Sequence, residues 1–227
     1  MNKVTVFLPC RRGSQRVKNK NVRPFANIKE GLIYIKLSQL LKVTEIEKIV
    51  LSTNDIEVKK IAASFHNTKI IIDDRPEELA SSTTSTDDLI KYIPDIIKEE
   101  TILWTHVTSP FVDAEVYQKA INKYFSNLDQ FDSLMSVTKL QTFLWNKSDP
   151  LNYDRRIEKW PRTQTIKPVY EINSGIFITN INTYKNLNDR IGEQPYLYEL
   201  NEKIAFDIDW EVDFEIAEVL WRKYGKI

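Results

Sequence analysis

The sequence has very little cysteine and histidine. Cys10 is the single cysteine, so the chain can form no intramolecular disulfide, which is the pattern of a reducing compartment. His66 and His106 are the only histidines, and neither has the neighbouring ligands that a zinc site requires. The sequence therefore supports neither a disulfide nor a zinc site.

Long apolar runs are missing as well. No stretch approaches the roughly 20 apolar residues that cross a bilayer. The apolar run that opens the chain is too short for a secretory signal and has no small-residue cleavage site. We therefore expect a cytoplasmic protein that does not bind membranes.

Glycine is scarce, and its spacing excludes several enzyme classes. No spacing among the five glycines forms a dinucleotide fingerprint or a P-loop, and no Gly-x-Ser-x-Gly elbow is present. A hydride-transfer enzyme, a P-loop kinase and a serine hydrolase of that type are therefore unsupported. The five are Gly13, Gly31, Gly175, Gly192 and Gly225.

The chain also lacks an excess of either charge. Lysine plus arginine and aspartate plus glutamate both number 32, so the formal net charge is zero. This balance gives no reason to expect affinity for nucleic acid or an anionic membrane surface. An anion site must come from local clustering of basic residues.

Strand-like and helix-like segments alternate through the first half of the chain. Apolar spacing predicts strands at 4–8, 48–53, 69–72, 101–107 and 133–137, and helices at 32–43, 56–65, 86–97 (bent or restarted at Pro94) and 113–125. A strand at 174–179 and a helix at 211–224 follow. This alternation predicts a single α/β domain over 1–227, with a mostly parallel sheet flanked by helices.

The predicted topology also predicts where a ligand binds. Ligands of such sheets lie beyond the carboxyl ends of the strands. The loops after Leu8, Thr53, Ile72 and Val107 should then line one crevice. The aromatic-rich stretch 138–172 has no clean period, and we interpret it as a substrate wall or a subunit interface.

The first loop is the strongest local signal. It follows a buried strand and combines Gly13 and Ser14, which allow close approach of the chain, with five basic side chains. A triphosphate needs several cations and such an approach. A solvated basic surface loop is the alternative, and the position after the first strand favours phosphate binding. The basic residues are Arg11, Arg12, Arg16, Lys18 and Lys20.

Asp207 and Asp209 form a pair of carboxylates two residues apart. In an extended segment both side chains point to the same face. Magnesium binds one or two carboxylates and completes its shell with phosphate and water. The alternative is a polar segment before a helix, with Asp209 as the helix cap.

Two further loops fall at the expected crevice. The hydroxyl-rich stretch 75–86 could bind a base and ribose, or simply cap a helix at the surface. Thr108-Ser109-Pro110 follows the fourth strand, and His106 lies at the end of that strand, where it could face the crevice.

Together these segments resemble the acylneuraminate cytidylyltransferases, the CMP-sialic acid synthetase family. Each motif is weak alone, but seven occur in the family's order across almost the whole chain. They are Arg11-x-Gly-Ser with Lys20-Asn21, Ser52-Thr-Asn-Asp55, Arg75-Pro-x-Glu-Leu-Ala80, Thr108-Ser-Pro110, Pro161-Arg-x-Gln164, Asn173-Ser-Gly-Ile-Phe-Ile178 and Asp207-Ile-Asp209.

The resemblance implies a fold, a cofactor and an assembly. It implies a Rossmann-like fold of the nucleotide-diphospho-sugar transferase type. It implies CTP and a sugar acid as substrates and Mg²⁺ as cofactor. It further implies a homodimer in which 138–172 serves as a small dimerisation extension.

The resemblance also assigns roles to residues. Arg11, Lys20 and Asp209 would be catalytic, and Asp207 and Asp209 would bind the metal. The nucleotide would contact Arg11, Gly13, Ser14, Lys20, Asn21, Arg75, Ser85 and Thr86. The sugar would contact His106, Thr108, Ser109, Arg162, Gln164 and Asn173.

This chain departs from the family pattern where the sugar would bind. His106 replaces a typical Gln, Val112 replaces a typical Arg, and Glu171 stands where a basic residue often occurs. A lysine expected near the sugar aligns with Trp145 or Asn146. The nucleotide half therefore matches well, and the sugar acid cannot be named.

The expected reaction joins CTP to the anomeric hydroxyl of a 2-keto-3-deoxy sugar acid, sialic acid-like, and releases pyrophosphate. The sequence singles out no general base. The ordinary pKa of histidine would suit His106 to that role, and the alternative is that His106 only makes a hydrogen bond to the sugar. Two alternatives stay open: a nucleotidyltransferase for a different sugar, and a non-catalytic module that binds sugar nucleotides.

Overall fold

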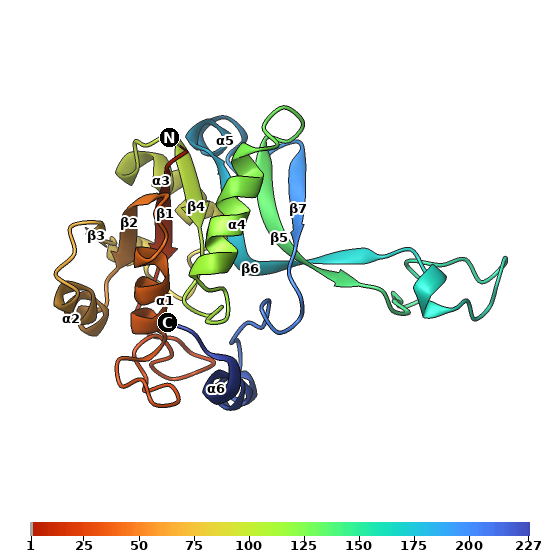
Figure 1. Ribbon diagram of the computed structural model, residues 1–227, viewed down its shortest axis with the longest axis horizontal. Helices are drawn as coiled ribbons and strands as arrows, with labels where there is room; N and C mark the ends of the chain where they lie inside the picture. The colour runs from red at the N-terminus through yellow and green to blue at the C-terminus, as the bar shows by residue number, and fades with distance from the viewer. Residues whose placement is uncertain (1) are drawn as a thin grey trace.

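The chain is built around one seven-stranded sheet. The computed structural model describes residues 2–227 and shows the strand order β3-β2-β1-β4-β6-β5-β7 (Figure 1). This confirms the predicted α/β class. The strands are β1 (Val4–Pro9), β2 (Ile46–Thr53), β3 (Ile70–Asp74), β4 (Thr101–Trp104), β5 (Ser133–Leu140), β6 (Val169–Asn180) and β7 (Pro195–Glu199).

Pairing is parallel in one half of the sheet and mixed in the other. β1 pairs in parallel with β2 and β4, and β2 with β3. β6 runs antiparallel to both β4 and β5, while β7 is parallel to β5. The carboxyl ends of β1, β2, β3 and β4 therefore meet at one edge, as the sequence predicts.

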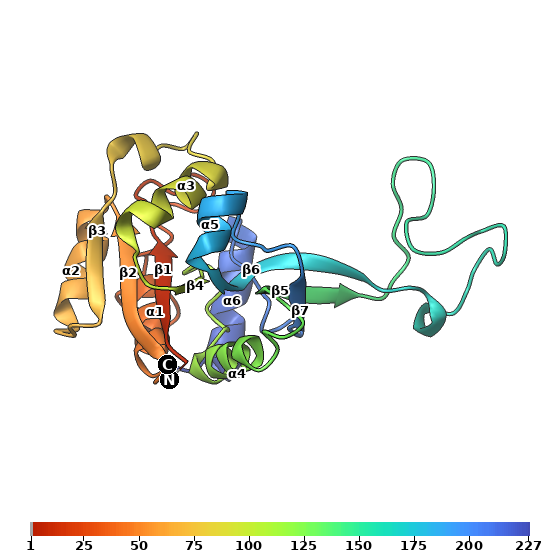
Figure 2. The same cartoon turned by 90° about the horizontal axis from the view of Figure 1, so that it is seen from above.

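Helices cover both faces of the sheet. Alternate residues of β1 divide between two apolar clusters: Val6 and Leu8 pack with α1, α4 and α6, whereas Phe7 packs with α3 and α5. Figure 2 shows these two helical layers on opposite sides of the sheet. The helices are α1 (Gly31–Leu41), α2 (Ile56–Ser64), α3 (Thr86–Ile96), α4 (Ala114–Phe125), α5 (Ile181–Leu187) and α6 (Glu211–Tyr224), with short 3-10 turns at Glu77–Leu79 and Thr163–Thr165.

Polar side chains fix the starts of several helices. Asp55 caps α2 and Asp113 caps α4 by accepting backbone N–H groups. Ser85 forms a capping box with Asp88 at the start of α3, which continues through Pro94 without a restart. Helix boundaries in this half of the chain therefore lie within a few residues of those predicted.

The segment between β5 and β6 projects from the body as an arm (Figures 1 and 2). Its base is a two-stranded ribbon that pairs Thr138 with Glu171 and Leu140 with Val169. The stretch 138–172, which shows no clean period in the sequence, is therefore paired at both ends. Residues 141–168 contain one 3-10 turn and one isolated bridge, between Trp145 and Pro150.

Candidate nucleotide-transfer site

A cleft of about 600 Å³ lies beyond the carboxyl ends of β1 and β4. Its position is the one that the strand order predicts. Eight of the predicted site residues line it: Arg11, Ser14, Lys20, Asn21, His106, Thr108, Asp207 and Asp209. The other seven lining residues were not predicted as ligands: Pro9, Cys10, Gln15, Arg16, Ser82, Val107 and Ser174.

The loop after β1 forms one wall of the cleft. Asn21 Nδ2 donates to the carbonyl of Arg11 at 3.1 Å, which ties the two ends of the loop together. The Arg11 guanidinium donates to the carbonyl of Gly13 at 3.3 Å. Gly13 has φ +78°, in the left-handed region that glycine favours. Gly13 itself forms the turn and does not line the cleft.

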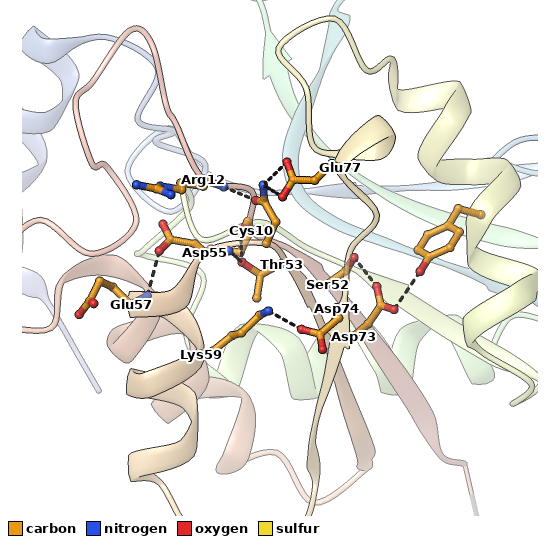
Figure 3. A network of polar contacts seen from close by, with 12 residues as sticks. Cys10, Arg12, Ser52, Thr53, Asp55, Glu57, Lys59, Asp73, Asp74 and Glu77 are labelled. Carbon is orange, nitrogen blue, oxygen red and sulfur yellow. Dashed lines mark hydrogen bonds and ion pairs between the residues drawn. The ribbon is translucent and has the colours of Figure 1, made fainter.

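The strand ends beneath this loop are held by polar contacts, which Figure 3 shows. The Thr53 hydroxyl donates to the carbonyl of Cys10 at 2.5 Å, and the backbone N–H of Arg12 donates to Asn54 Oδ1 at 2.9 Å. Asn54 in turn donates to the carboxylate of Glu77. These contacts connect the ends of β1, β2 and β3, so the loop is anchored before any ligand binds.

Lys20 connects the basic loop to the segment that carries Asp207 and Asp209 on the opposite side of the cleft. Its side chain is buried, and Nζ donates to the carbonyl of Ile208 at 2.6 Å. Burial lowers the pKa of Lys20, while the carboxylates of Asp207 and Asp209 act in the opposite direction. The ammonium thus lies between the basic loop and the two aspartates.

The aspartate pair lies on an extended segment before α6. Both carboxylates line the cleft, while Ile208 between them is buried in the core. The backbone N–H of Ile208 donates to the carbonyl of Thr108 at 3.0 Å, which fixes the segment against the loop after β4. The i, i+2 spacing therefore places both carboxylates on the same side, as an extended chain requires.

The two carboxylates have different surroundings. Asp207 accepts from the Ser109 hydroxyl at 3.2 Å, and burial raises its pKa, with the charge of Asp209 adding to the shift. Asp209 forms an ion pair of 2.7 Å with Arg16 in a half-exposed setting. Asp213 accepts the N–H groups of Asp209 and Trp210, so Asp209 does not cap α6 with its own side chain.

His106 lines the cleft from the end of β4. Its Nε2 accepts from the indole Nε1 of Trp104 at 2.8 Å. Burial, followed by the charge of Arg190, lowers the pKa of His106 to about 3. The ring is therefore neutral at physiological pH.

Several predicted nucleotide contacts lie outside the cleft. Arg75 is buried and donates to the hydroxyl and the carbonyl of Ser52. Ser85 and Thr86 start α3, where the Ser85 hydroxyl is engaged with Asp88. From the hydroxyl-rich stretch 75–86, the structure brings Ser82 to the cleft instead.

The predicted sugar contacts divide in the same way. Thr108 lines the cleft, and Ser109 lies beneath it against Asp207. The Asn173 side chain is engaged with Ser136 and Thr138 inside the sheet. Arg162 precedes the 3-10 turn of the arm and Gln164 lies within that turn, and neither residue lines the cleft of this chain.

None of the helices in 2–227 combines the length and hydropathy that spanning a bilayer would need.

Comparison with known proteins identifies the family. The chain is 27% identical to N-acylneuraminate cytidylyltransferase of Escherichia coli, over 99% of this chain and 53% of that protein. It is 24% identical to post-translational flagellin modification protein B of Campylobacter coli, over 97% and 95% of the two chains. The chain thus spans about half the length of the first of these relatives.

Solved structures show the same fold. A CMP:2-keto-3-deoxy-manno-octonic acid synthetase complexed with CTP superposes with a TM-score of 0.67, at 14% identity over 97% of this chain and 99% of that one. A 4-diphosphocytidyl-2C-methyl-D-erythritol synthase from Anaerococcus prevotii gives 0.65, at 15% identity over 98% and 100%. The sequence model described as Cytidylyltransferase matches residues 5–224, and the chain belongs to this family.

Proposed function

We propose that this protein transfers CMP from CTP to the anomeric hydroxyl of a 2-keto-3-deoxy sugar acid and releases pyrophosphate. One observation carries the proposal: a single cleft joins a basic loop, a buried lysine and two aspartates at the carboxyl edge of the sheet. The names of the relatives support both cytidylyl transfer and a sugar acid as acceptor.

The basic loop would bind the triphosphate. Arg11 and Lys20 supply positive charge at the cleft, and Ser14 and Asn21 supply neutral donors. In the transfer, the anomeric oxygen bonds to the α-phosphorus and the bond to the pyrophosphate oxygen breaks. Pyrophosphate leaves with that electron pair, and the hydroxyl proton passes to water. Cations positioned on the leaving group stabilise the charge that it gains.

The aspartates would hold magnesium. Within residues 2–227 no cluster of three or more His, Cys, Asp or Glu side chains is present, so the protein offers two carboxylates. That set fits Mg²⁺, which takes its remaining ligands from phosphate and water. The raised pKa of Asp207 also fits a metal ligand, because it shows that the protein alone does not fully stabilise the buried carboxylate and that a cation would. When bound, the ion would neutralise phosphate charge and acidify the attacking hydroxyl.

The arm would make the protein a homodimer. Large apolar side chains on it are exposed, among them Ile157 at 88% and Trp160 at 68%. Exposed apolar groups gathered on one segment are typical of interaction sites. Arg162 and Gln164, on the same arm, would then contact the sugar bound to the partner subunit.

The test is pyrophosphate release from CTP with a panel of eight- and nine-carbon keto-acids. We expect Lys20→Ala and Asp209→Ala to lower turnover by about 100-fold or more, since each removes a charged transition-state contact. Lys18 lies on the same loop but is exposed and does not line the cleft, and Asp129 lies on an exposed loop, so Lys18→Ala and Asp129→Ala are matched controls that should keep their turnover. Near-wild-type turnover in both site variants would show that the site is assigned wrongly.

The same panel separates the alternatives. Preference for UTP or GTP would reject CTP as the donor, and turnover with a sugar 1-phosphate alone would reject the sugar acid. Tight CTP binding without turnover on any acceptor would identify a non-catalytic binding module. Mass spectrometry of the CMP conjugate would name the acceptor.

A further inference from the structure

The contact between Trp104 and His106 determines where the histidine proton lies. An indole N–H can only donate, and Trp104 Nε1 points at His106 Nε2 at 2.8 Å. Nε2 must therefore be unprotonated, which leaves the proton of the neutral ring on Nδ1. Turning the ring over would aim a C–H at the indole N–H, so this contact also fixes the ring's orientation.

Trp104 is itself held firmly. Its side chain is 1% exposed, and Phe7 packs edge-on against it with ring centroids 4.8 Å apart. The Arg190 guanidinium lies 4.8 Å from the Trp104 ring centroid and 3.8 Å from that of Phe177. The indole donor therefore has little freedom to turn away from His106.

The charges around His106 preserve the neutral form. The charged groups with the largest effects on its pKa are cations, and they add to the effect of burial: Arg190, Lys20, Arg75 and Lys36. The carboxylates of Asp207 and Asp209 line the same cleft. With Nε2 occupied and the ring uncharged, His106 has one donor and no free acceptor nitrogen. Within the described residues, no protein group accepts from Nδ1.

We propose that Trp104 fixes His106 as an Nδ1–H donor that binds an oxygen acceptor of the sugar acid, a carboxylate or acyl carbonyl oxygen, and that His106 is not a general base. Trp104 is thus a positioning residue, and His106 determines specificity. The identity of the bound group rests on the proposed function, whereas the tautomer does not.

Nitrogen-15 NMR of histidine-labelled protein tests the tautomer directly. His66, the only other histidine, is exposed and provides an internal reference, and His66→Gln assigns its signals. We expect His106 to show a protonated Nδ1 and a bare Nε2 between pH 5 and 8. An Nε2–H tautomer, or an imidazolium at pH 7, would overturn the inference even in an active enzyme.

Variants test the role in binding. Trp104→Phe keeps an aromatic ring but removes the donor, so His106 should populate both tautomers. Because a hydrogen bond is worth about 1.4 kcal/mol here, His106→Leu should raise KM for the sugar acid about tenfold with KM for CTP unchanged. His106→Gln keeps an N–H donor and should recover most of that loss.

These outcomes are separable from the proposed function. If no sugar acid reacts but the Nδ1–H tautomer is found, the proposed function fails and the role of Trp104 stands. A fall in kcat of His106→Leu without a change in KM would instead indicate a general base and reject the donor role. Should Trp104→Phe not fold, wild-type NMR and the two His106 variants still decide the question.

Discussion

The side chain of Lys36 is fully buried between α1 and the loop that follows β4. Its ammonium donates to the carbonyls of Ser109 and Val112 and to the Tyr117 hydroxyl, at 2.8 to 3.0 Å. Ser109 in turn donates to Asp207. This one cation therefore supports the loop that underlies the aspartate side of the cleft.

Lys36→Met should destabilise the protein by about 2 kcal/mol, because two buried carbonyls would lose their donor. Burial lowers the pKa of Lys36 to about 7, and removing that desolvation cost offsets part of the loss. Urea unfolding measures the change. Lys29→Met, at an exposed position, should stay within about 0.5 kcal/mol, and an equally small effect at Lys36 would contradict the supporting role.

His106 should contribute to acid sensitivity. Its pKa in the folded state is about 3, below the ordinary value of 6.5. As pH falls from 6.5 to 3, the unfolded chain takes up a proton at this site that the folded chain does not, so stability is lost across that window. Below about 3 both states are protonated and the slope ends.

His106→Gln should therefore lose less stability than wild type between pH 6.5 and 4. Because carboxylates titrate in the same range, the quantity to measure is the difference between wild type and His106→Gln in melting temperature, plotted against pH. His66→Gln, at an exposed site, is the control. If the melting temperatures of wild type and His106→Gln fell equally with pH, His106 would not titrate as described.

At the scale of the elements, two glycines with positive φ hold different kinds of turn. Gly13 turns the phosphate-side loop with φ +78° and no atom within 4 Å of an added Cβ. Gly31 starts α1 with φ +70°, and an added Cβ would fall 2.3 Å from the carbonyl oxygen of Arg23. A substitution at Gly13 therefore tests backbone conformation alone, whereas one at Gly31 also introduces a steric clash.

Gly13→Ala should cost about 1 kcal/mol, the penalty of a left-handed conformation for an L-residue. Gly31→Ala should cost clearly more, since backbone must move to relieve the clash. Gly13→Asn should cost less than Gly13→Ala because asparagine tolerates this conformation. Thermal unfolding ranks the three, and equal losses for the two alanine variants would contradict the geometry.

Elements with strong apolar periods were predictable, and those determined by tertiary pairing were not. α6 occurs at 211–224 as its pattern predicts. The antiparallel course of β6 follows from the lack of a crossover helix in 141–168, because parallel neighbours need such a connection. β7 is a short edge strand that begins at Pro195, and its partly buried residues give no clear alternation.

At the scale of the whole molecule, the predicted order of strands and helices indicated where the cleft lies, but it did not indicate which residues line it. The carboxyl edge of a parallel sheet gathers loops from distant segments, so Arg11, Lys20 and Thr108 could be placed together in advance, whereas Asp207 was placed with them only by the family resemblance. Arg75 also follows a strand, but its guanidinium is buried and donates to Ser52, so it does not reach the cleft. The contribution of Trp104 depends on a side-chain contact that no sequence spacing reveals.

The arm offers a test at this same scale. Its tip has its own small cluster, in which Phe143 packs edge-on against Tyr153 and Trp160, and Arg155 lies over Trp145. Those contacts leave much of Trp160 and nearly all of Ile157 exposed. A segment that extends away from the core gains little burial from its own chain, and this exposure supports the proposed homodimer.

If the protein is the proposed homodimer, wild type should sediment as a dimer and Ile157→Lys as a monomer in analytical ultracentrifugation. The unfolding free energy per monomer should change by less than about 0.5 kcal/mol. The side chain has almost no intramolecular packing to lose, and a charge buried in an interface is costly. Ile56→Lys is the matched control, because Ile56 is 63% exposed on α2 and away from the arm. If Ile157→Lys sediments as wild type does, the arm does not hold the subunits together through this residue.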